Sequence, residues 1–293
     1  ATFTMPGETE GAAITISGGQ AFENTTTRAY VDGTIVDSAT GVVYHEDTGF
    51  FVSEDGQRLS PGFKTSVGFD NYREVFTSEE FRGPFVRVLL WNFAFAALSV
   101  ITTFALGLFL ASALNEARMR GRKVYRSLLI IPYALPGFMT ALVWKGMLNY
   151  TYGVNRWLPF DIPWLTSTGG AMFSLILVNL WLGYPYMFLV NTGALQSIPS
   201  ELKEAASIDG ANGFMAFRKI TLPLLLVSVS PLLIASFAFN FNNFTLVFLL
   251  TGGQPRAGGE SAGRTDLLIT WAYRVALDQS PQRQGLAAAL VVV

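Results

Sequence analysis

The stretch Pro199–Pro223 reads PSELKEAASIDGANGFMAFRKITLP and separates two long apolar segments. It has acidic residues near its beginning, small residues at Ala205 and Ala206, and Gly210 where a helix could end in the left-handed conformation. We therefore expect a short polar helix at a membrane surface, with a smooth face onto which another protein can pack. An amphipathic helix that only lies in the membrane interface would share these features, so the pattern alone leaves both interpretations open.

The uncharged segments of the chain are long enough to cross a membrane. Charged residues make up only 14% of the 293 residues, whereas a soluble domain usually carries about 25%. A span needs about 20 apolar residues, and the last of the four qualifying segments is long enough to run on into a loop. The four expected spans are Arg87–Leu114, Tyr125–Leu148, Ala171–Leu195 and Ile220–Leu250. The predicted fold is an all-α polytopic transmembrane helical bundle.

The two ends of the chain indicate a piece of a longer protein. The chain begins without Met, and its last residues, Gly285–Val293, form an apolar run. We expect spans to be missing before residue 1 and the last span to be truncated.

The distribution of charge predicts which loops lie on which side of the membrane. The loop after the first span carries Arg118, Arg120, Arg122, Lys123 and Arg126 against Glu116. Basic loops stay in the cytoplasm, so residues 1–84, with 13 of the 21 acids, are external and the loop 199–219 is cytoplasmic. The transmembrane domain then covers residues 85–293.

Residues 1–84 have the pattern of a partial, β-rich extracytoplasmic segment. Short alternating pieces are separated by Asp-Gly and Thr-Gly turn signals. These pieces are Ala13–Ser17, Thr34–Val36, Val42–Tyr44 and Phe50–Val52.

Residue types that carry catalysis or hold metals are scarce in this sequence. It has no cysteine and one histidine, His45, which lies outside the expected spans, and a lone histidine rarely makes a metal site. The expected spans contain no paired acids and no nucleophile–base set, and the sequence has no basic run typical of nucleic-acid binding. We therefore expect no catalytic residue, no metal and no nucleic acid partner.

Uncharged polar residues form a stripe in each of two expected spans. The fourth span has a stripe at i, i+3, i+4 and i+7, made of Ser236, Phe239, Asn240 and Asn243. The third span repeats this spacing with Asn179, Leu182, Gly183 and Tyr186. Amides hydrogen-bond hydroxyl groups and aromatic rings stack on sugars, so these uncharged stripes favour a neutral, hydroxyl-rich ligand. Hydrogen bonds between helices, worth about 0.6 kcal/mol each, would explain the same amides.

The spacing that follows Glu204 matches a known motif. Glu204, Ala205 and Ala206 are followed after three residues by Gly210, and after nine more by ITLP at Ile220–Pro223. This pattern resembles the EAA motif of ABC-importer permeases. The resemblance implies that the Glu-Ala-Ala group and the glycine seat on a nucleotide-binding subunit and transmit its ATP-driven motion. Because this sequence has no G-x-x-x-x-G-K-[ST] loop, ATP and Mg²⁺ would be bound by partner ATPase subunits, and no cofactor by this chain.

A wider resemblance runs from about residue 60 to the end of the chain. The sequence resembles the MalF-type permease subunits of maltose/maltodextrin importers. The blocks that carry the resemblance are Tyr125–Pro136, Asn179–Met187, Ile234–Phe244, Thr265–Leu268 and Ala272–Arg274. The resemblance implies a type I, MetI-like permease fold with the end of an external domain, spans four to seven and the start of span eight. It also implies that the matching positions of the two stripes line the sugar site.

The same resemblance implies partners and a location. The partners are a second, MalG-like permease subunit, a MalK-like ATPase homodimer, a periplasmic sugar-binding protein, and maltose or maltodextrins. The location is the lipid bilayer of a bacterial inner membrane, with residues 1–84 in the periplasm.

Other classes of function would fit parts of the sequence. A permease for another neutral sugar or a polyol would share both stripes. A secondary transporter driven by H⁺ or Na⁺ normally needs an acid within a span, and the four expected spans contain none. A membrane-anchored receptor would use the cytoplasmic helix for docking and show no transport when it is combined with an ATPase and a binding protein.

Overall fold

The computed structural model describes most of the chain in two compact units, residues 1–69 and residues 70–293. The described residues are 13–17, 20–24, 28–47, 49–59, 62–63, 65–115, 120–278 and 283–292. In the predicted basic loop, Glu116 and Arg118 lie outside these ranges, and so does Val293 of the predicted last span.

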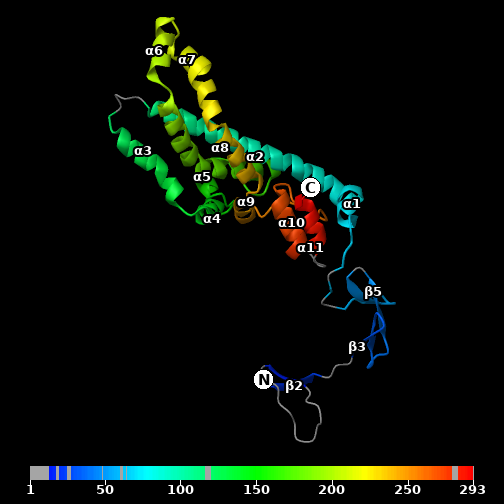
Figure 1. The fold of residues 1–293 in the computed structure, drawn as a ribbon. Coiled ribbons are helices and arrows are strands. Elements are labelled where there is room, and N and C mark those ends of the chain that lie inside the picture. Colours follow the sequence, from blue (N-terminus) through cyan, green and yellow to red (C-terminus); the bar gives the residue numbers. More distant parts are fainter. Residues whose placement is uncertain are drawn as a thin grey trace. The chain divides into compact units, whose positions relative to one another are not determined.

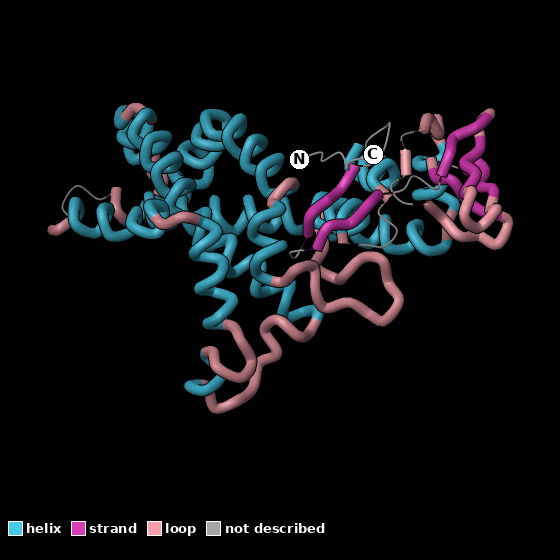
Figure 2. The backbone as a smooth tube through the Cα atoms, turned by 90° about the horizontal axis from the view of Figure 1, so that it is seen from below, coloured by secondary structure: helices cyan, strands magenta, loops and turns pink. Residues whose placement is uncertain are grey.

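The N-terminal unit is made of antiparallel strands, drawn in magenta in Figure 2. The strands are β1 (Ala13–Ser17), β2 (Gln20–Asn24), β3 (Arg28–Val31), β4 (Thr34–Asp37), β5 (Val43–Asp47) and β6 (Phe50–Ser53). β1 pairs with β2, and β3 to β6 form a four-stranded sheet in chain order. Arg28 pairs with Asp37 across β3 and β4 at 3.1 Å and holds the pKa of that carboxyl below its usual value. The predicted β-rich character of this segment is confirmed.

The second unit is helical (Figure 1). Its elements are α1 (Asp70–Thr77), α2 (Glu79–Ala113), α3 (Arg122–Ile130), η1 (Ile131–Ala134), α4 (Gly137–Met147), η2 (Val154–Trp157), α5 (Thr168–Ser197), α6 (Ser200–Ile208), α7 (Gly213–Ala216), η3 (Phe217–Thr221), α8 (Leu222–Phe241), α9 (Phe244–Leu250), α10 (Leu268–Leu277) and α11 (Gln284–Val292). Within the described residues, three helices are long and apolar enough to cross a membrane: α2, α5 and the continuous helix Gly213–Phe241. A bent pair, Arg122–Ala134 with Gly137–Met147, makes a fourth candidate span.

The helical unit begins before the boundary that we expected at residues 84 and 85. The two compact units divide between Phe69 and Asp70. Val75 of α1 and Phe81 of α2 are fully buried in one apolar cluster with Trp271 of α10. These contacts join α1 and the start of α2 to the helices that follow.

The second expected span, Tyr125–Leu148, is not a single helix. Its two helical pieces are bent by 90° relative to each other. Pro132 and Pro136 account for the break, because proline lacks an N–H and disfavours the helical conformation in the residue before it. Leu135 accordingly has extended backbone angles, φ −84° and ψ 135°.

The fourth expected span, Ile220–Leu250, is also divided. α8 ends at Phe241, and α9 begins at Phe244, with two residues between them. The expected loop at the end of this span is therefore a second short helix. α10 has no counterpart among the elements expected from the sequence.

α2 and α5 pack side by side and run in the same direction. Phe95 of α2 shares an apolar cluster with Val178 of α5. Further along both helices, Leu108 of α2 shares another cluster with Phe188 of α5. Because the order of these contacts is the same in both helices, the two helices are parallel.

α8 runs antiparallel to α2. Val229, in the first half of α8, lies in the same apolar cluster as Leu108, in the second half of α2. Phe241, at the end of α8, meets Phe93 of α2 edge-on, with ring centroids 5.1 Å apart. Successive spans of a membrane protein alternate in direction. If the bent pair counts as one span between α2 and α5, then α2, α5 and α8 have the directions that this alternation requires.

α2 and α5 approach each other closely at Gly107. A Cβ atom added to this residue would lie 2.7 Å from backbone atoms of Met187 and Phe188. Gly183 makes a second close approach, since its added Cβ would lie 2.8 Å from the Cγ2 atom of Thr103. Small residues let the backbones of membrane helices approach closely, and they do so here.

We predict that Gly107→Ala lowers the free energy of unfolding by about 1 to 3 kcal/mol, because the added methyl group overfills the α2–α5 contact. The measurement is the midpoint of thermal unfolding of the purified protein in detergent. Gly193→Ala in α5 is the matched control, because an added Cβ there meets nothing within 4 Å. Alanine is the better helix former by about 1 kcal/mol, so the control keeps or raises the midpoint. Equal midpoints for the two variants would contradict the close packing.

Candidate substrate pocket and coupling helix

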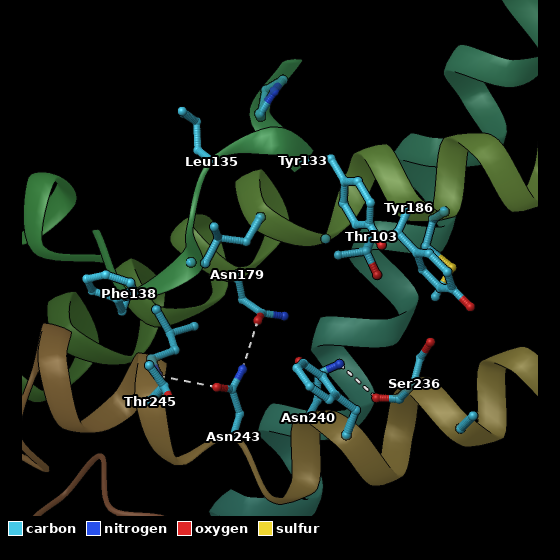
Figure 3. Close-up of a pocket in the computed structure, with 18 residues that line it drawn as sticks. Thr103, Tyr133, Leu135, Phe138, Asn179, Tyr186, Ser236, Asn240, Asn243 and Thr245 are labelled. Atoms are coloured by element: carbon cyan, nitrogen blue, oxygen red, sulfur yellow. Dashed lines mark hydrogen bonds between the residues drawn. The ribbon is translucent and has the colours of Figure 1, made fainter. Parts of the chain in front are cut away.

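A pocket of about 740 Å³ lies between α2, α5, the bent pair and the α8–α9 corner (Figure 3). All eight residues of the two predicted stripes line it: Asn179, Leu182, Gly183, Tyr186, Ser236, Phe239, Asn240 and Asn243. The other lining residues are Thr103, Pro132, Tyr133, Leu135, Gly137, Phe138, Met187, Ala235, Thr245 and Leu246. The structure therefore brings the two stripes together around one space.

The two stripes meet through a hydrogen bond between amides. The Nδ2 atom of Asn243 donates to the Oδ1 atom of Asn179 at 3.3 Å. The Oδ1 atom of Asn243 also accepts from the backbone N–H of Leu246 at 3.3 Å, so Asn243 caps the start of α9. Asn243 was expected on a continuous helix with Ser236, and this part of the prediction is wrong, because α8 ends at Phe241. The corner between the helices nevertheless keeps Asn243 at the pocket.

Asn240 presents an unused hydrogen-bond acceptor at the pocket. Its Nδ2 atom donates to the backbone carbonyl of Ser236 at 2.8 Å. Its Oδ1 atom is buried and has no hydrogen-bond partner in the described part of the chain. A buried acceptor without a partner carries an energetic cost, which a hydroxyl group of a ligand would remove once the side chain turns to expose this atom to the pocket.

Two rings and a glycine give the pocket the rest of its shape. The side chain of Phe239 is 72% exposed, so its ring is free to contact a ligand. Tyr186 is half-buried on the opposite stripe. Gly183 lies against Thr103 of α2, so its lack of a side chain serves the packing of the helices as well as the pocket wall.

The sequence did not point to the pocket wall that the bent pair supplies. Tyr133, Leu135 and Phe138 line the pocket from η1, from the joint that follows it and from α4. The available signal was Pro132 and Pro136, which mark the break that brings this segment to the pocket (Figure 3). Thr103 is a further lining residue from α2 that no periodic pattern indicates.

The chemistry of the pocket is neutral and amphipathic. None of the eighteen lining residues is charged, and together they offer amides, hydroxyl groups and aromatic rings. Such a lining binds a ligand through hydrogen bonds and stacking rather than through ion pairs. A hydroxyl-rich, uncharged molecule fits these groups best.

The predicted polar helix is α6, and it ends as the sequence predicts. Gly210 has a left-handed φ of 78°. The N–H of Ala211 donates to the carbonyl of Ala206 at 2.9 Å, and the N–H of Gly210 donates to that of Ser207 at 3.1 Å. These two bonds are a Schellman motif, which satisfies the last carbonyls of a helix.

The surface of α6 differs from the expected smooth face in one respect. Ala206 is buried, and α6 packs against α7 of the same chain. Glu204 and Ala205 are exposed, and Ile208 is 87% exposed. The open surface of α6 therefore includes Glu204, Ala205 and Ile208, whereas Ala206 is buried within the chain. Figure 1 shows α6 and α7 at the opposite end of the bundle from α10 and α11.

Comparisons with known proteins agree on one family. The family model for "Binding-protein-dependent transport system inner membrane component" matches residues 88–293. The "Maltose/maltodextrin transport system permease protein MalF" of Klebsiella aerogenes is 43% identical over 278 residues, which are 89% of this chain and 54% of the relative. The protein of the same name from Escherichia coli (strain K12) is 42% identical over the same shares. The chain thus spans about half the length of these curated relatives.

Solved structures share the fold. A bacterial ABC transporter that imports the acidic polysaccharide alginate contains a chain with a TM-score of 0.65 and 25% identity, and the match covers 78% of both chains. The MetNI methionine ABC transporter shares the fold at a TM-score of 0.52 and 18% identity, with 74% of this chain and 90% of that chain covered.

The fold and the pocket define a membrane-embedded component of a transport system. The chain belongs to the family of binding-protein-dependent transport system inner membrane components. This family consists of the non-catalytic permease subunits of ABC transporters, which are multi-pass proteins of the inner membrane. The predicted MetI-like fold, non-catalytic character and membrane location are confirmed.

Proposed function

We propose that this chain belongs to a permease subunit that forms the translocation pathway for maltose and maltodextrins in an ATP-driven importer. The observation that carries the proposal is the single neutral pocket in which both stripes meet. The free Oδ1 atom of Asn240 and the exposed ring of Phe239 suit a sugar hydroxyl and a sugar ring face. The 43% identity to a maltose/maltodextrin permease supports this choice of sugar.

Movement of the bundle would be driven from α6. Separate ATPase subunits, a MalK-like homodimer, would seat on its exposed face and would bind the ATP and Mg²⁺, while this chain binds no cofactor. α7, η3 and α8 form one continuous helix from Gly213 to Phe241. A displacement of α6 and α7 would therefore be carried by a single continuous helix to Asn240 in the pocket.

Other partners would complete the importer. A second, MalG-like permease subunit would form the rest of the pathway, and a periplasmic sugar-binding protein would deliver maltose or a maltodextrin. Residues 1–84 would lie on the periplasmic side, as their acidity and the basic loop on the other side of α2 favour. Alginate is an acidic polysaccharide, and binding it would call for basic side chains. The described pocket is lined by no basic residue, so we expect a neutral sugar rather than an acidic one.

Reversing the charge of Glu204 tests the coupling role of α6. In Glu204→Lys we expect the ATPase subunits to detach or to hydrolyse ATP without transport, because the exposed side chain would face its partner with the wrong charge. The measurements are co-purification of the ATPase and sugar uptake into proteoliposomes. Asp161→Lys is the control, since Asp161 is exposed in the loop before α5, outside α6, and undergoes the same reversal of charge. Unchanged transport by Glu204→Lys would remove the coupling assignment.

Removing one group from each stripe tests the sugar site. Asn240→Ala and Tyr186→Ala are expected to abolish maltodextrin uptake while the complex still assembles, because each takes away a group that would contact the sugar. Uptake of radiolabelled maltose and co-purification of the partners measure the two effects. Asn242→Ala is the matched control: its amide bonds the carbonyl four residues earlier, as that of Asn240 does, but it does not line the pocket. Normal uptake by both pocket variants would refute the site.

A further inference from the structure

Asn92 of α2 is completely buried. Its amide makes one hydrogen bond as a donor and one as an acceptor. Its Nδ2 atom donates to the backbone carbonyl of Phe241 at 2.9 Å, and its Oδ1 atom accepts from the backbone N–H of Leu268 at 2.8 Å. Phe241 is the last residue of α8, and Leu268 is the first residue of α10. One side chain therefore joins the ends of two helices that are distant in the sequence.

Both backbone groups need a partner because of where they lie. The last carbonyls and the first N–H groups of a helix have no partner within that helix. In an apolar interior an unsatisfied backbone group is costly. Asn92 satisfies one group of each kind, and it stands beside Phe93, whose ring packs on Phe241.

The carbonyl end of this bridge lies at the corner that carries pocket residues. α8 stops at Phe241, and the chain turns through Asn242 and Asn243 into α9. Asn240 precedes the corner by one residue, and Asn243 follows it and bonds to Asn179 across the pocket. A shift of the Phe241 carbonyl would move both amides relative to the opposite stripe.

The N–H end of the bridge rests on a rigid polar network. Asp266 is fully buried, forms an ion pair with Arg274, and accepts hydrogen bonds from the N–H of Gly263 at 2.7 Å and the hydroxyl of Thr270 at 2.9 Å. Arg274 also donates to the carbonyl of Gly252 at 2.9 Å. This network stabilises the start of α10. The Leu268 N–H that donates to Asn92 is therefore positioned by residues that do not line the pocket.

We propose that Asn92 is a positioning residue that sets the geometry of the sugar pocket by anchoring the α8–α9 corner to the start of α10. It does not line the pocket, and it acts through the Phe241 carbonyl on Asn240 and Asn243. The proposal rests on the proposed function in so far as the ligand is a neutral sugar. The anchoring itself concerns this chain alone.

The test places a reporter thiol next to the corner. Thr245 lines the pocket in the first turn of α9, is exposed, and is not one of the proposed sugar contacts. The chain contains no cysteine, so Thr245→Cys in the full-length, otherwise cysteine-free transporter provides one reactive group there. The rate of alkylation by a water-soluble maleimide is measured in the assembled complex without sugar and with increasing maltotriose.

Asn92→Asp removes the donor to Phe241 and keeps the shape and the acceptor for Leu268. We expect the sugar-free alkylation rate to change at least threefold, and half-protection to need at least tenfold more maltotriose. Asn191→Asp is the matched control: Asn191 is as completely buried and donates to the carbonyl of Phe104, but it does not line the pocket or bond the corner. Its rate and protection should stay within twofold of those of the parent.

Leu268→Pro tests the same bridge from its other end if Asn92→Asp does not assemble. Proline is tolerated at the first position of a helix. It removes the N–H that donates to Asn92, and it replaces the buried side chain of Leu268 with a smaller apolar one. The preceding Leu267 already has the extended angles, φ −93° and ψ 165°, that a residue before proline prefers. The same shifts in rate and protection are expected for this variant.

Two results would overturn the anchoring role: parent-like alkylation in Asn92→Asp or Leu268→Pro, or an equal shift in Asn191→Asp. A failure of the proposed function has a different signature. In that case no neutral saccharide slows alkylation of the Thr245→Cys transporter. The alkylation rates without sugar, compared with and without Asn92→Asp, still test the anchoring role.

Discussion

The structure depends on one constraint: within a membrane, every backbone N–H and C=O must find a partner inside the protein. Unbroken helices satisfy this constraint by themselves, and broken ones need help from side chains. The pocket is built at two such breaks. At one, Pro132 and Pro136 remove donors and open the bent pair; at the other, the side chains of Asn243 and Asn92 bond the backbone groups that the α8–α9 corner leaves free.

This constraint explains why amides dominate the site. Asn carries a donor and an acceptor on one uncharged group, so it can close a helix end without the cost of burying a charge. Asn243 does this toward α9 and still reaches Asn179. Only the Oδ1 atom of Asn240, among the amide groups of the pocket, is left buried without a partner. The residues that hold the corner are thus the same type as those proposed to hold the sugar.

The α6–α7 end and the α10 end of the bundle have different roles in the proposed transporter. α6 packs on α7, which begins the helix that ends at Phe241, whereas α10 and the Asp266–Arg274 network lie on the other side of that residue. The pocket lies between the two ends. Partners that act on the ends can change the pocket only through a difference in affinity between two states of the bundle, and the corner is the element on which both ends act.

The sequence alone predicted much of the pocket lining, for physical reasons. Polar residues in apolar spans turn inward, so a helical period found all eight stripe residues at the pocket. The same period ran past the end of α8, because two asparagines do not interrupt the polar pattern even though they end the helix. Thr103 and Phe138 were missed because they join the pocket only through tertiary packing.

The role of Asn92 was equally invisible in the sequence. Its partners are backbone groups 149 and 176 residues away, and no local pattern marks such contacts. Ala206 illustrates the opposite error: its motif predicted an open face, but its side chain is buried within the chain.

The most direct test of the account is a sugar panel on the full-length protein, co-expressed with a second permease subunit, an ATPase and a periplasmic binding protein. The quantity measured is ATP hydrolysis stimulated by the binding protein loaded with each sugar. The account predicts stimulation and uptake with maltose and neutral maltodextrins, and none with acidic oligosaccharides, because the pocket offers amides and rings but no base. Transport of an acidic oligosaccharide, or of no neutral sugar at all, would contradict it.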